Sequence, residues 1–298
     1  MDSIGVNLQA VRERMVSAAK RCGRDITEVG LIAVSKTFGT DAIAAAHAHG
    51  QCAFGENHVQ EAVRKIATLP HLLESRIASA NREHHAPTSD ARGHPSGVAS
   101  PEGPLLRPAE WRIASANREH HAPTSDARGH SSGVASPEGP LLRPAEWHFI
   151  GPIQSNKTRV IAQHFDWVHS IERLIIAERL SATRAEGLAP LQVCIQINIG
   201  DELSKSGVAA DEALALAHAV AELPRLKLRG LMAIPPASTD HAQQRRHFAR
   251  LRQIKDAIVR SGIALDTLSM GMSDDFEAAI AEGATLVRVG RAIFGSRS

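Results

Sequence analysis

Short apolar runs and longer amphipathic stretches alternate along most of the chain. Eight short runs are rich in β-branched or aromatic residues, as buried strands are, and they span 31–36, 52–56, 147–151, 167–171, 193–199, 228–234, 267–270 and 286–290. Alanine-rich stretches with helical spacing separate them, at 41–49, 59–68, 156–164, 173–185, 211–223, 241–260 and 274–282, and another leads the chain at 4–22. Eight strand-then-helix units predict an α/β fold, a single (β/α)8 TIM-type barrel with an N-terminal helix.

Two other α/β folds share this alternation. A doubly wound open sheet remains the alternative, because periodicity alone does not show whether a sheet closes. A dinucleotide-binding Rossmann sheet is less favoured, since no GxGxxG follows any of the eight runs.

One region interrupts the alternation between the second and third runs. Residues 76–111 recur at 112–147 with a single difference, which marks a recent tandem duplication rather than a solenoid. The two copies hold nine of the chain's 15 prolines, show no sustained apolar period, and are each neutral. Such a unit buries too little apolar surface to offset its ordering entropy. We therefore expect one domain, 1–298, interrupted by a duplicated low-complexity insertion at 76–147 that forms a long disordered loop.

Composition narrows the classes of protein that fit. Of 298 residues, 34 are Lys or Arg and 32 are Asp or Glu, so the net charge of +2 carries no nucleic-acid signature. No apolar run has the roughly 18–20 residues of a membrane span, and the first residues lack the pattern of a signal peptide. Cys22, Cys52 and Cys194 are odd in number and far apart, which favours a reducing cytoplasm.

Histidines in the insertion raise the question of metal binding. Pairs occur at 84–85 and 120–121, and His94 and His130 follow them. Because no structured ligand spacing and no cysteine accompany them, polar loop residues are the favoured interpretation. No metal site is predicted.

Lys36 ends the apolar run LIAVSK, at the end of a strand where a barrel carries its chemistry. Partial desolvation there favours the neutral amine, which can attack a carbonyl. The alternative is a lysine whose stem lies along the strand end while its ammonium reaches solvent.

Two later segments suit an anionic ligand. In SMGMSDDF, Ser273 is placed to cap a helix led by two aspartates, and a helix N-terminus is a ready phosphate site; an ordinary capped helix is the alternative. In LVRVGRAIFG, Arg288 faces the opposite side from the two flanking valines, and Gly290 permits close approach of a ligand. A buried arginine there needs either a ligand or a structural ion pair.

A strand-end lysine, a phosphate-competent turn and an inward arginine together suggest a phosphorylated aldehyde held as a Schiff base. Pyridoxal phosphate fits that description. A sugar-phosphate aldolase, which uses a similar lysine, stays open at this point.

Seven motifs, in order, make the chain similar to a known family. They are AVSK (33–36), FGENHVQE (54–61), EWHFIGPIQSNKTR (146–159), QINIGDELSKSG (196–207), LRGLMAIP (228–235), LSMGMSDDFEAAI (268–280) and VRVGRAIFG (287–295). Outside 76–145 the chain resembles the pyridoxal phosphate homeostasis protein family over essentially its whole length. The resemblance implies a barrel like the first domain of alanine racemase, with pyridoxal phosphate as the cofactor.

The resemblance also implies which residues bind the cofactor. Lys36 would form the Schiff base, Asn57 would lie beside the cofactor ring, and Arg288 would face the pyridine nitrogen. Ser273 and the backbone at Gly290 and Arg291 would hold the phosphate.

Two positions depart from the family's pattern. His58 stands where tyrosine is usual, which leaves any hydroxyl contact from that position open. Arg291 stands where a small residue is common, and it adds a cation that either approaches the phosphate or points outward.

The same residues bear on activity. An arginine that donates to the pyridine nitrogen keeps it unprotonated, which weakens carbanion chemistry. Alanine racemase uses a tyrosine as its second acid–base, and this chain has no tyrosine, leaving His58 and His169 as candidates. We expect a cytoplasmic carrier or regulator of pyridoxal phosphate and amino-acid homeostasis, with no catalytic residues. A slow racemase, or an interaction protein whose insertion docks a partner, is the alternative.

The resemblance also shapes the expected partners. We expect a monomer that passes the cofactor to apo-enzymes. Neither a nucleic acid nor a membrane is expected to bind it.

Overall fold

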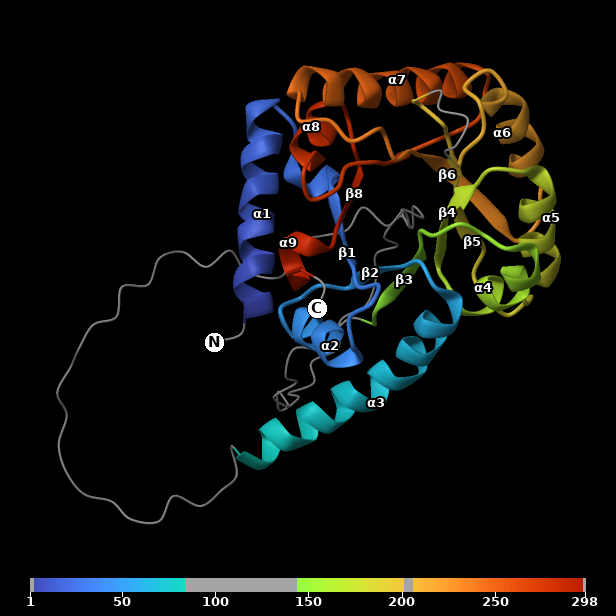
Figure 1. The fold of residues 1–298 in the computed structure, drawn as a ribbon. Coiled ribbons are helices and arrows are strands. Elements are labelled where there is room, and N and C mark those ends of the chain that lie inside the picture. Colours follow the sequence, from blue (N-terminus) through green and yellow to red (C-terminus); the bar gives the residue numbers. More distant parts are fainter. Residues whose placement is uncertain (1–2, 84–143, 201–205, 297–298) are drawn as a thin grey trace, which may run out of the picture.

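The strands form a closed parallel barrel, as the alternating pattern predicts. The computed structural model describes residues 3–83, 144–200 and 206–296. The strands follow one another around the barrel in chain order, and β1 pairs with β8 to close it (Figure 1). They are β1 (Gly30–Val34), β2 (Ala53–Glu56), β3 (Glu146–Phe149), β4 (Trp167–Ile171), β5 (Leu191–Gln196), β6 (Leu226–Met232), β7 (Thr267–Ser269) and β8 (Leu286–Val289). Closure excludes the doubly wound open sheet.

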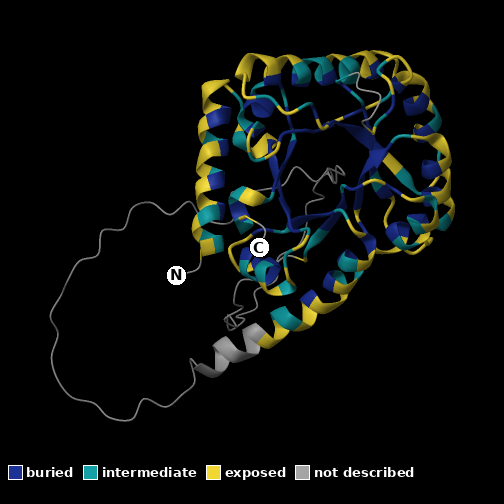
Figure 2. Ribbon diagram, viewed as in Figure 1, coloured by how far each residue is buried: buried dark blue, intermediate teal, exposed yellow. Residues whose placement is uncertain are grey.

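Helices lie around the outside of the barrel, and Figure 2 shows their outer faces exposed while the strands inside are buried. The α-helices are α1 (Ser3–Arg21), α2 (Thr40–Ala48), α3 (Val59–Glu83), α4 (Thr158–His164), α5 (Leu174–Thr183), α6 (Ala213–Ala221), α7 (His241–Arg260), α8 (Phe276–Ala281) and α9 (Arg291–Phe294). Two short 3-10 helices, η1 (Ile26–Glu28) and η3 (Ser155–Lys157), precede β1 and α4. The N-terminal helix is as predicted, whereas α9 and η1 were not predicted.

Two clusters of buried apolar residues show which side of each strand faces the barrel interior. The larger cluster packs the strands against the helices and includes Val287 and Val289. The smaller cluster consists of Ile32, Ala53, Trp167, Cys194, Met232 and Leu286. Because successive side chains along a strand point to opposite sides, the smaller cluster lies inside the barrel. Arg288, between the two valines, points into the same interior, as predicted.

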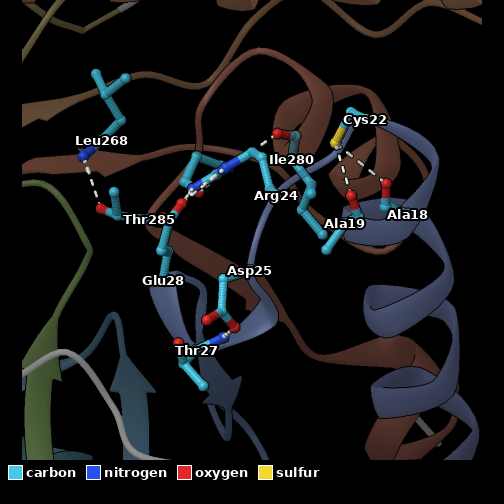
Figure 3. A network of polar contacts seen from close by, with 11 residues as sticks. Ala18, Ala19, Cys22, Arg24, Asp25, Thr27, Glu28, Leu268, Ile280 and Thr285 are labelled. Atoms are coloured by element: carbon cyan, nitrogen blue, oxygen red, sulfur yellow. Dashed lines mark hydrogen bonds and ion pairs between the residues drawn. The ribbon is translucent and has the colours of Figure 1, made fainter.

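A polar network fixes the loop before β1 against the end of α8 (Figure 3). Arg24 Nη1 donates to the carbonyl oxygens of Ile280 and Ala284, at 2.8 Å each. Its Nη2 lies 3.2 Å from Glu28 Oε2. Ile280 lies in the last turn of α8, where carbonyl oxygens have no intrahelical partners, so the cationic donor satisfies one of them. The contact holds the start of the first strand beside the segment that leads into the last.

The helix after β2 is longer than the sequence pattern predicts. It continues to Glu83, so residues 76–83 are helical and the prediction of a disordered loop is wrong for this part of the insertion. The physical reason lies in the segment RIASANRE, which contains neither glycine nor proline and is rich in residues that tolerate a helix. The first proline of the insertion comes only at Pro87.

The other end of the insertion joins the barrel directly. Glu146 and Trp147 belong to the second copy of the repeat and begin β3. Residues 84–143, with the histidines at 84–85, 94, 120–121 and 130, lie outside the described residues, so the prediction of disorder there stays a prediction.

Deleting residues 76–111 is expected to change Tm little. The deletion joins α3 to the second copy, whose first residues (112–119) repeat 76–83, and this copy still supplies the start of β3. Halving a flexible loop changes its closure free energy by only about 0.6 kcal/mol. Calorimetry of the deletion and the full chain checks this. A fall in Tm above about 5 °C would mean that the first copy packs against the barrel.

Candidate functional site

The barrel brings the predicted site residues to one end. All eight strands are parallel, so their carboxyl ends share one rim. Most of the predicted positions directly follow a strand or lie in the loop after one, and Arg288 points inward from β8. The predicted residues at this end are Lys36, Asn57, Ser273, Arg288, Gly290 and Arg291. The topology therefore makes neighbours of segments from both ends of the chain.

Asn57 presents a buried acceptor at this rim. Its Oδ1 atom is inaccessible to solvent and has no hydrogen-bond partner among the described residues. The loop after β3 presses against it, since a Cβ on Gly151 would lie 2.5 Å from the carbonyl oxygen of Asn57. A buried polar atom without a partner is costly, and such atoms in native proteins call for an explanation such as a ligand.

Glycine at position 290 lets the end of β8 approach the end of β1. A Cβ on Gly290 would lie 3.0 Å from the carbonyl oxygen of Val34. Gly290 is also the N-cap of α9, and the first N–H groups of any helix have no intrahelical acceptors. Arg291 points outward, because its guanidinium lies 2.5 Å from Asp274 Oδ2 and both side chains are exposed. This resolves the two orientations left open for the Arg291 cation.

The prediction that Ser273 caps the next helix is wrong. The N-cap of α8 is Asp275, and the helix begins at Phe276. The reason is local: Asp275 Oδ1 accepts the N–H of Met272 at 2.6 Å, which turns the loop back before the helix starts. Ser273 is half-buried within this loop, so its contact with a phosphate stays a prediction.

Arg288 is buried and bound to neutral acceptors. Its guanidinium donates to Ser269 Oγ at 2.6 Å and to the carbonyl oxygen of Ala233 at 2.9 Å. Within the described part of the chain it forms no ion pair, so the structural ion-pair interpretation does not hold there. Burial lowers its pKa to about 10, although Asp275 and Cys194 act in the opposite direction. Arg288 therefore still carries its charge near pH 7.

A chain of buried polar side chains leads from Arg288 across the barrel interior. Ser269 Oγ lies 2.8 Å from Nδ1 of His169. Nε2 of His169 lies 3.0 Å from Nδ1 of His148, whose Nε2 lies 3.5 Å from Glu146 Oε2. These residues come from β8, β7, β4 and β3, so this series of side-chain contacts connects both halves of the barrel.

The contact between Arg288 and Ser269 has a fixed direction. A guanidinium only donates, so Ser269 Oγ accepts from Arg288 and is free to donate its own proton to Nδ1 of His169. Burial lowers the pKa of His169 well below its usual value, and the nearby His148 and Arg288 lower it further. His169 is therefore neutral near pH 7, with both ring nitrogens engaged.

We expect the protein to lose stability as the pH falls below about 6.5, partly through His169. Folded His169 stays neutral, whereas the unfolded chain takes up a proton there. The unfolded state then binds more protons, so the free energy of unfolding falls with pH, by up to about 1.4 kcal/mol per pH unit. Urea unfolding of the wild type and His169→Gln near pH 7 and near pH 5 measures the difference. Parallel pH dependences would contradict the assignment.

The sequence pattern did not single out several of these residues. His148 is the one polar side chain between Trp147 and Phe149, and an inward polar residue in an apolar strand was the available signal. The pairing of His148 with His169, and of His169 with Ser269, depends on which strands are neighbours and so had no local signal.

Other chemistry is limited in the described part of the chain. No group of three or more His, Cys, Asp or Glu side chains there is arranged to hold a metal ion. No helix within the described ranges is long and apolar enough to cross a bilayer. Burial raises the pKa of the Cys194 thiol to about 12, which makes it unreactive.

Comparisons with known proteins place this chain in a class of barrels. A family model described as "Alanine racemase, N-terminal domain" matches residues 6–298. The "Pyridoxal phosphate homeostasis protein" of Pseudomonas aeruginosa is 43% identical over 297 residues, covering 100% of this chain and 97% of the relative. The protein of the same name from Escherichia coli K12 is 42% identical over 302 residues, covering 100% and 98%. The chain belongs to the pyridoxal phosphate homeostasis protein family.

A solved structure adds a ligand to the comparison. PipY of Synechococcus elongatus, determined with PLP bound, is 28% identical to this chain with a TM-score of 0.65. The similarity covers 98% of this chain and 100% of PipY.

Proposed function

We propose that this chain binds pyridoxal phosphate at the carboxyl-terminal rim of its barrel and acts as a carrier or regulator in cofactor and amino-acid homeostasis. Two relatives of more than 40% identity carry the homeostasis name, and PipY has PLP bound on the same fold. The observation in this structure that carries the proposal is the buried Oδ1 of Asn57, which has no hydrogen-bond partner among the described residues and follows β2, the neighbour of the strand that leads to half-buried Lys36.

The residues at the rim fit this cofactor. When bound, pyridoxal phosphate supplies an aldehyde that a lysine amine can hold as a Schiff base. Lys36 would be that lysine, and Arg288 would donate a hydrogen bond to the ring nitrogen. Ser273 and the backbone at Gly290 and Arg291 would hold the phosphate, at the place where Gly290 lets the end of β8 approach the end of β1.

We propose further that the protein is not an efficient enzyme. Arg288 keeps its charge near pH 7 and can only donate hydrogen bonds, so a ring nitrogen that it contacts must accept and stays unprotonated. His58 is exposed, and both ring nitrogens of His169 are engaged in the barrel interior, which leaves neither placed as a second acid–base. Exchange of the α-proton of alanine for deuterium, followed by NMR, tests this; turnover at the rate of an ordinary racemase would contradict it.

The binding itself is tested on the purified chain. We expect a yellow chromophore that borohydride reduces to a stable adduct, and mass spectrometry of peptides should place the adduct on Lys36. A protein that takes up no pyridoxal phosphate when the cofactor is added in excess would contradict the proposal. The carrier role predicts that the loaded protein restores activity to an apo-enzyme that needs the cofactor.

The state in which the protein works is also a proposal. We propose a monomer in the cytoplasm, with cofactor-requiring apo-enzymes as partners. Gel filtration with light scattering measures the mass, and a stable dimer at micromolar concentration would contradict the first part.

A further inference from the structure

The segment that carries Lys36 is held from two sides by buried polar groups. On one side, Ser35 is fully buried, and its Oγ donates to Glu56 Oε1 at 2.7 Å. The carbonyl oxygen of Ser35 accepts from Lys65 Nζ at 2.8 Å. The backbone just before Lys36 is thus fixed both by β2, which ends at Glu56, and by α3, which contains Lys65.

On the other side, Thr37 holds a strained backbone conformation. Its φ is 71°, in the left-handed region that a β-branched residue rarely adopts. Its N–H donates to Glu61 Oε1 at 2.8 Å. Such strain persists only where the surroundings impose it, and in proteins it gathers at functional sites.

Lys65 joins these two sides. Its ammonium group, on a side chain that is 6% exposed, donates to Ser35 O, to Glu56 Oε1 at 2.7 Å and to Glu61 Oε1 at 2.6 Å. These three bonds use all three of its protons. One buried cation therefore connects the carboxylate that holds the residue before Lys36 with the carboxylate that holds the residue after it.

The cluster is not arranged for stability alone. Glu56 makes both of its hydrogen bonds through Oε1, and its Oε2 is buried without a partner among the described residues. Buried ion pairs are often replaceable by apolar residues without loss of stability, so their presence is weak support for a purely stabilising role.

We propose that Lys65, together with Glu56 and Glu61, is a positioning residue for Lys36: the cluster fixes the backbone on both sides of Lys36 and so directs its amine into the rim. This inference rests on the proposed function, because the direction of the amine matters for a ligand that bonds to it. It adds residues from β2 and α3 that do not themselves touch the ligand.

Thr37→Gly tests the proposal. Glycine keeps the backbone N–H that binds Glu61 and leaves the ion pairs in place, but it removes the side chain that confines the backbone, so the segment after Lys36 gains conformational freedom. Glycine adopts a positive φ without strain, so a merely structural cluster predicts unchanged stability and unchanged attachment of pyridoxal phosphate. Positioning predicts unchanged Tm but attachment weakened about tenfold, with a shifted pH midpoint in the absorption spectrum of the lysine-linked chromophore.

Arg225→Gly is the matched control. Arg225 also has a positive φ, 61°, but precedes β6 at the opposite end of the barrel. Its substitution also removes the hydrogen bond from Arg225 Nε to the carbonyl oxygen of Ser181, so it sets an upper limit on effects that come from folding alone. Attachment and spectrum should stay at wild-type values in this variant.

A second measurement does not need the cofactor. Trace labelling of the unloaded protein with acetic anhydride, read by mass spectrometry, gives the reactivity of Lys36 relative to Lys157. We expect this ratio to change several-fold in Thr37→Gly and in Glu61→Ala, and to stay constant in Arg225→Gly. Unchanged labelling ratios would overturn the positioning role. A wild type that fails to take up pyridoxal phosphate would overturn the proposed function instead, and the labelling would still decide the positioning.

Lys65 itself is tested by two substitutions. Lys65→Arg keeps a buried cation and should retain attachment within about threefold, whereas Lys65→Met should lose most of it. If Lys65→Met does not fold, the Thr37→Gly and Glu61→Ala results decide alone. Equal attachment in folded Lys65→Met and wild type would overturn the proposal.

Discussion

Replacing Lys36 with alanine is expected to abolish the borohydride-reducible chromophore while leaving Tm nearly unchanged. Lys36 is half-buried and lies outside the hydrogen-bonded part of β1, so removing its side chain leaves no large cavity. The groups proposed for the phosphate and the ring do not depend on the amine. Weak, non-covalent binding of pyridoxal phosphate should therefore persist, and calorimetric titration with and without borohydride treatment separates the two modes.

Lys157 supplies the control for this experiment. It lies in η3, after β3, and is the alternative attachment site if Lys36 is not used. Lys157→Ala should keep the full chromophore. A Lys36→Ala protein with an intact reducible chromophore would move the attachment to another lysine, and the mass of the labelled peptide would identify it.

Reversing the charge at position 288 is expected to change the chemistry of the site. The carboxylate introduced by Arg288→Glu would hold a proton at the ring nitrogen, which makes the bound cofactor a stronger electron sink. We expect more transamination with added amino acids and faster release of the cofactor. Changes in the absorbance of the bound cofactor over time measure both the transamination and the release.

The same substitution should cost stability. The new carboxylate would face the carbonyl oxygen of Ala233 in place of a donor, in a buried position. A loss of about 1–3 kcal/mol is expected. Arg288→Lys keeps a cation and is the matched control. If the folded Arg288→Glu protein binds and reacts as the parent does, Arg288 does not contact the ring nitrogen.

The fold was predictable because its signal is local and repeated. Each strand is a short apolar run, each helix has its own period, and eight repeats of the unit leave few architectures. The start of α8 was missed because a single side chain, Asp275, ties back the loop that contains Ser273. The end of α3 was missed because the repeat as a whole is rich in proline, although its first residues are not.

The site was predictable only at positions where residue type and strand end coincide. Lys36 and Arg288 stand out because each is a lone charge in an apolar strand. The partners that hold them come from elsewhere: Ser269 meets His169 across a separation of 100 residues, and Lys65 reaches back from α3 to Ser35. Such contacts are set by the neighbours that barrel closure creates, which no local pattern encodes.

The closure of the barrel between β1 and β8 has a consequence for folding. This seam joins the first and last strands, with Ile32 opposite Arg288, so among the strand pairs of the barrel it closes the longest loop. A ligand that contacts both Lys36 and the backbone at Gly290 spans the seam and binds only when it is closed. By mass action such a ligand works as a reversible cross-link, stabilising by about 2.7 kcal/mol at a hundredfold excess over its Kd. Amide exchange in β1 and β8 would then slow more on loading than exchange in β4 and β5. The exchange rate at this one pair of strands would therefore report how much of the protein holds the cofactor.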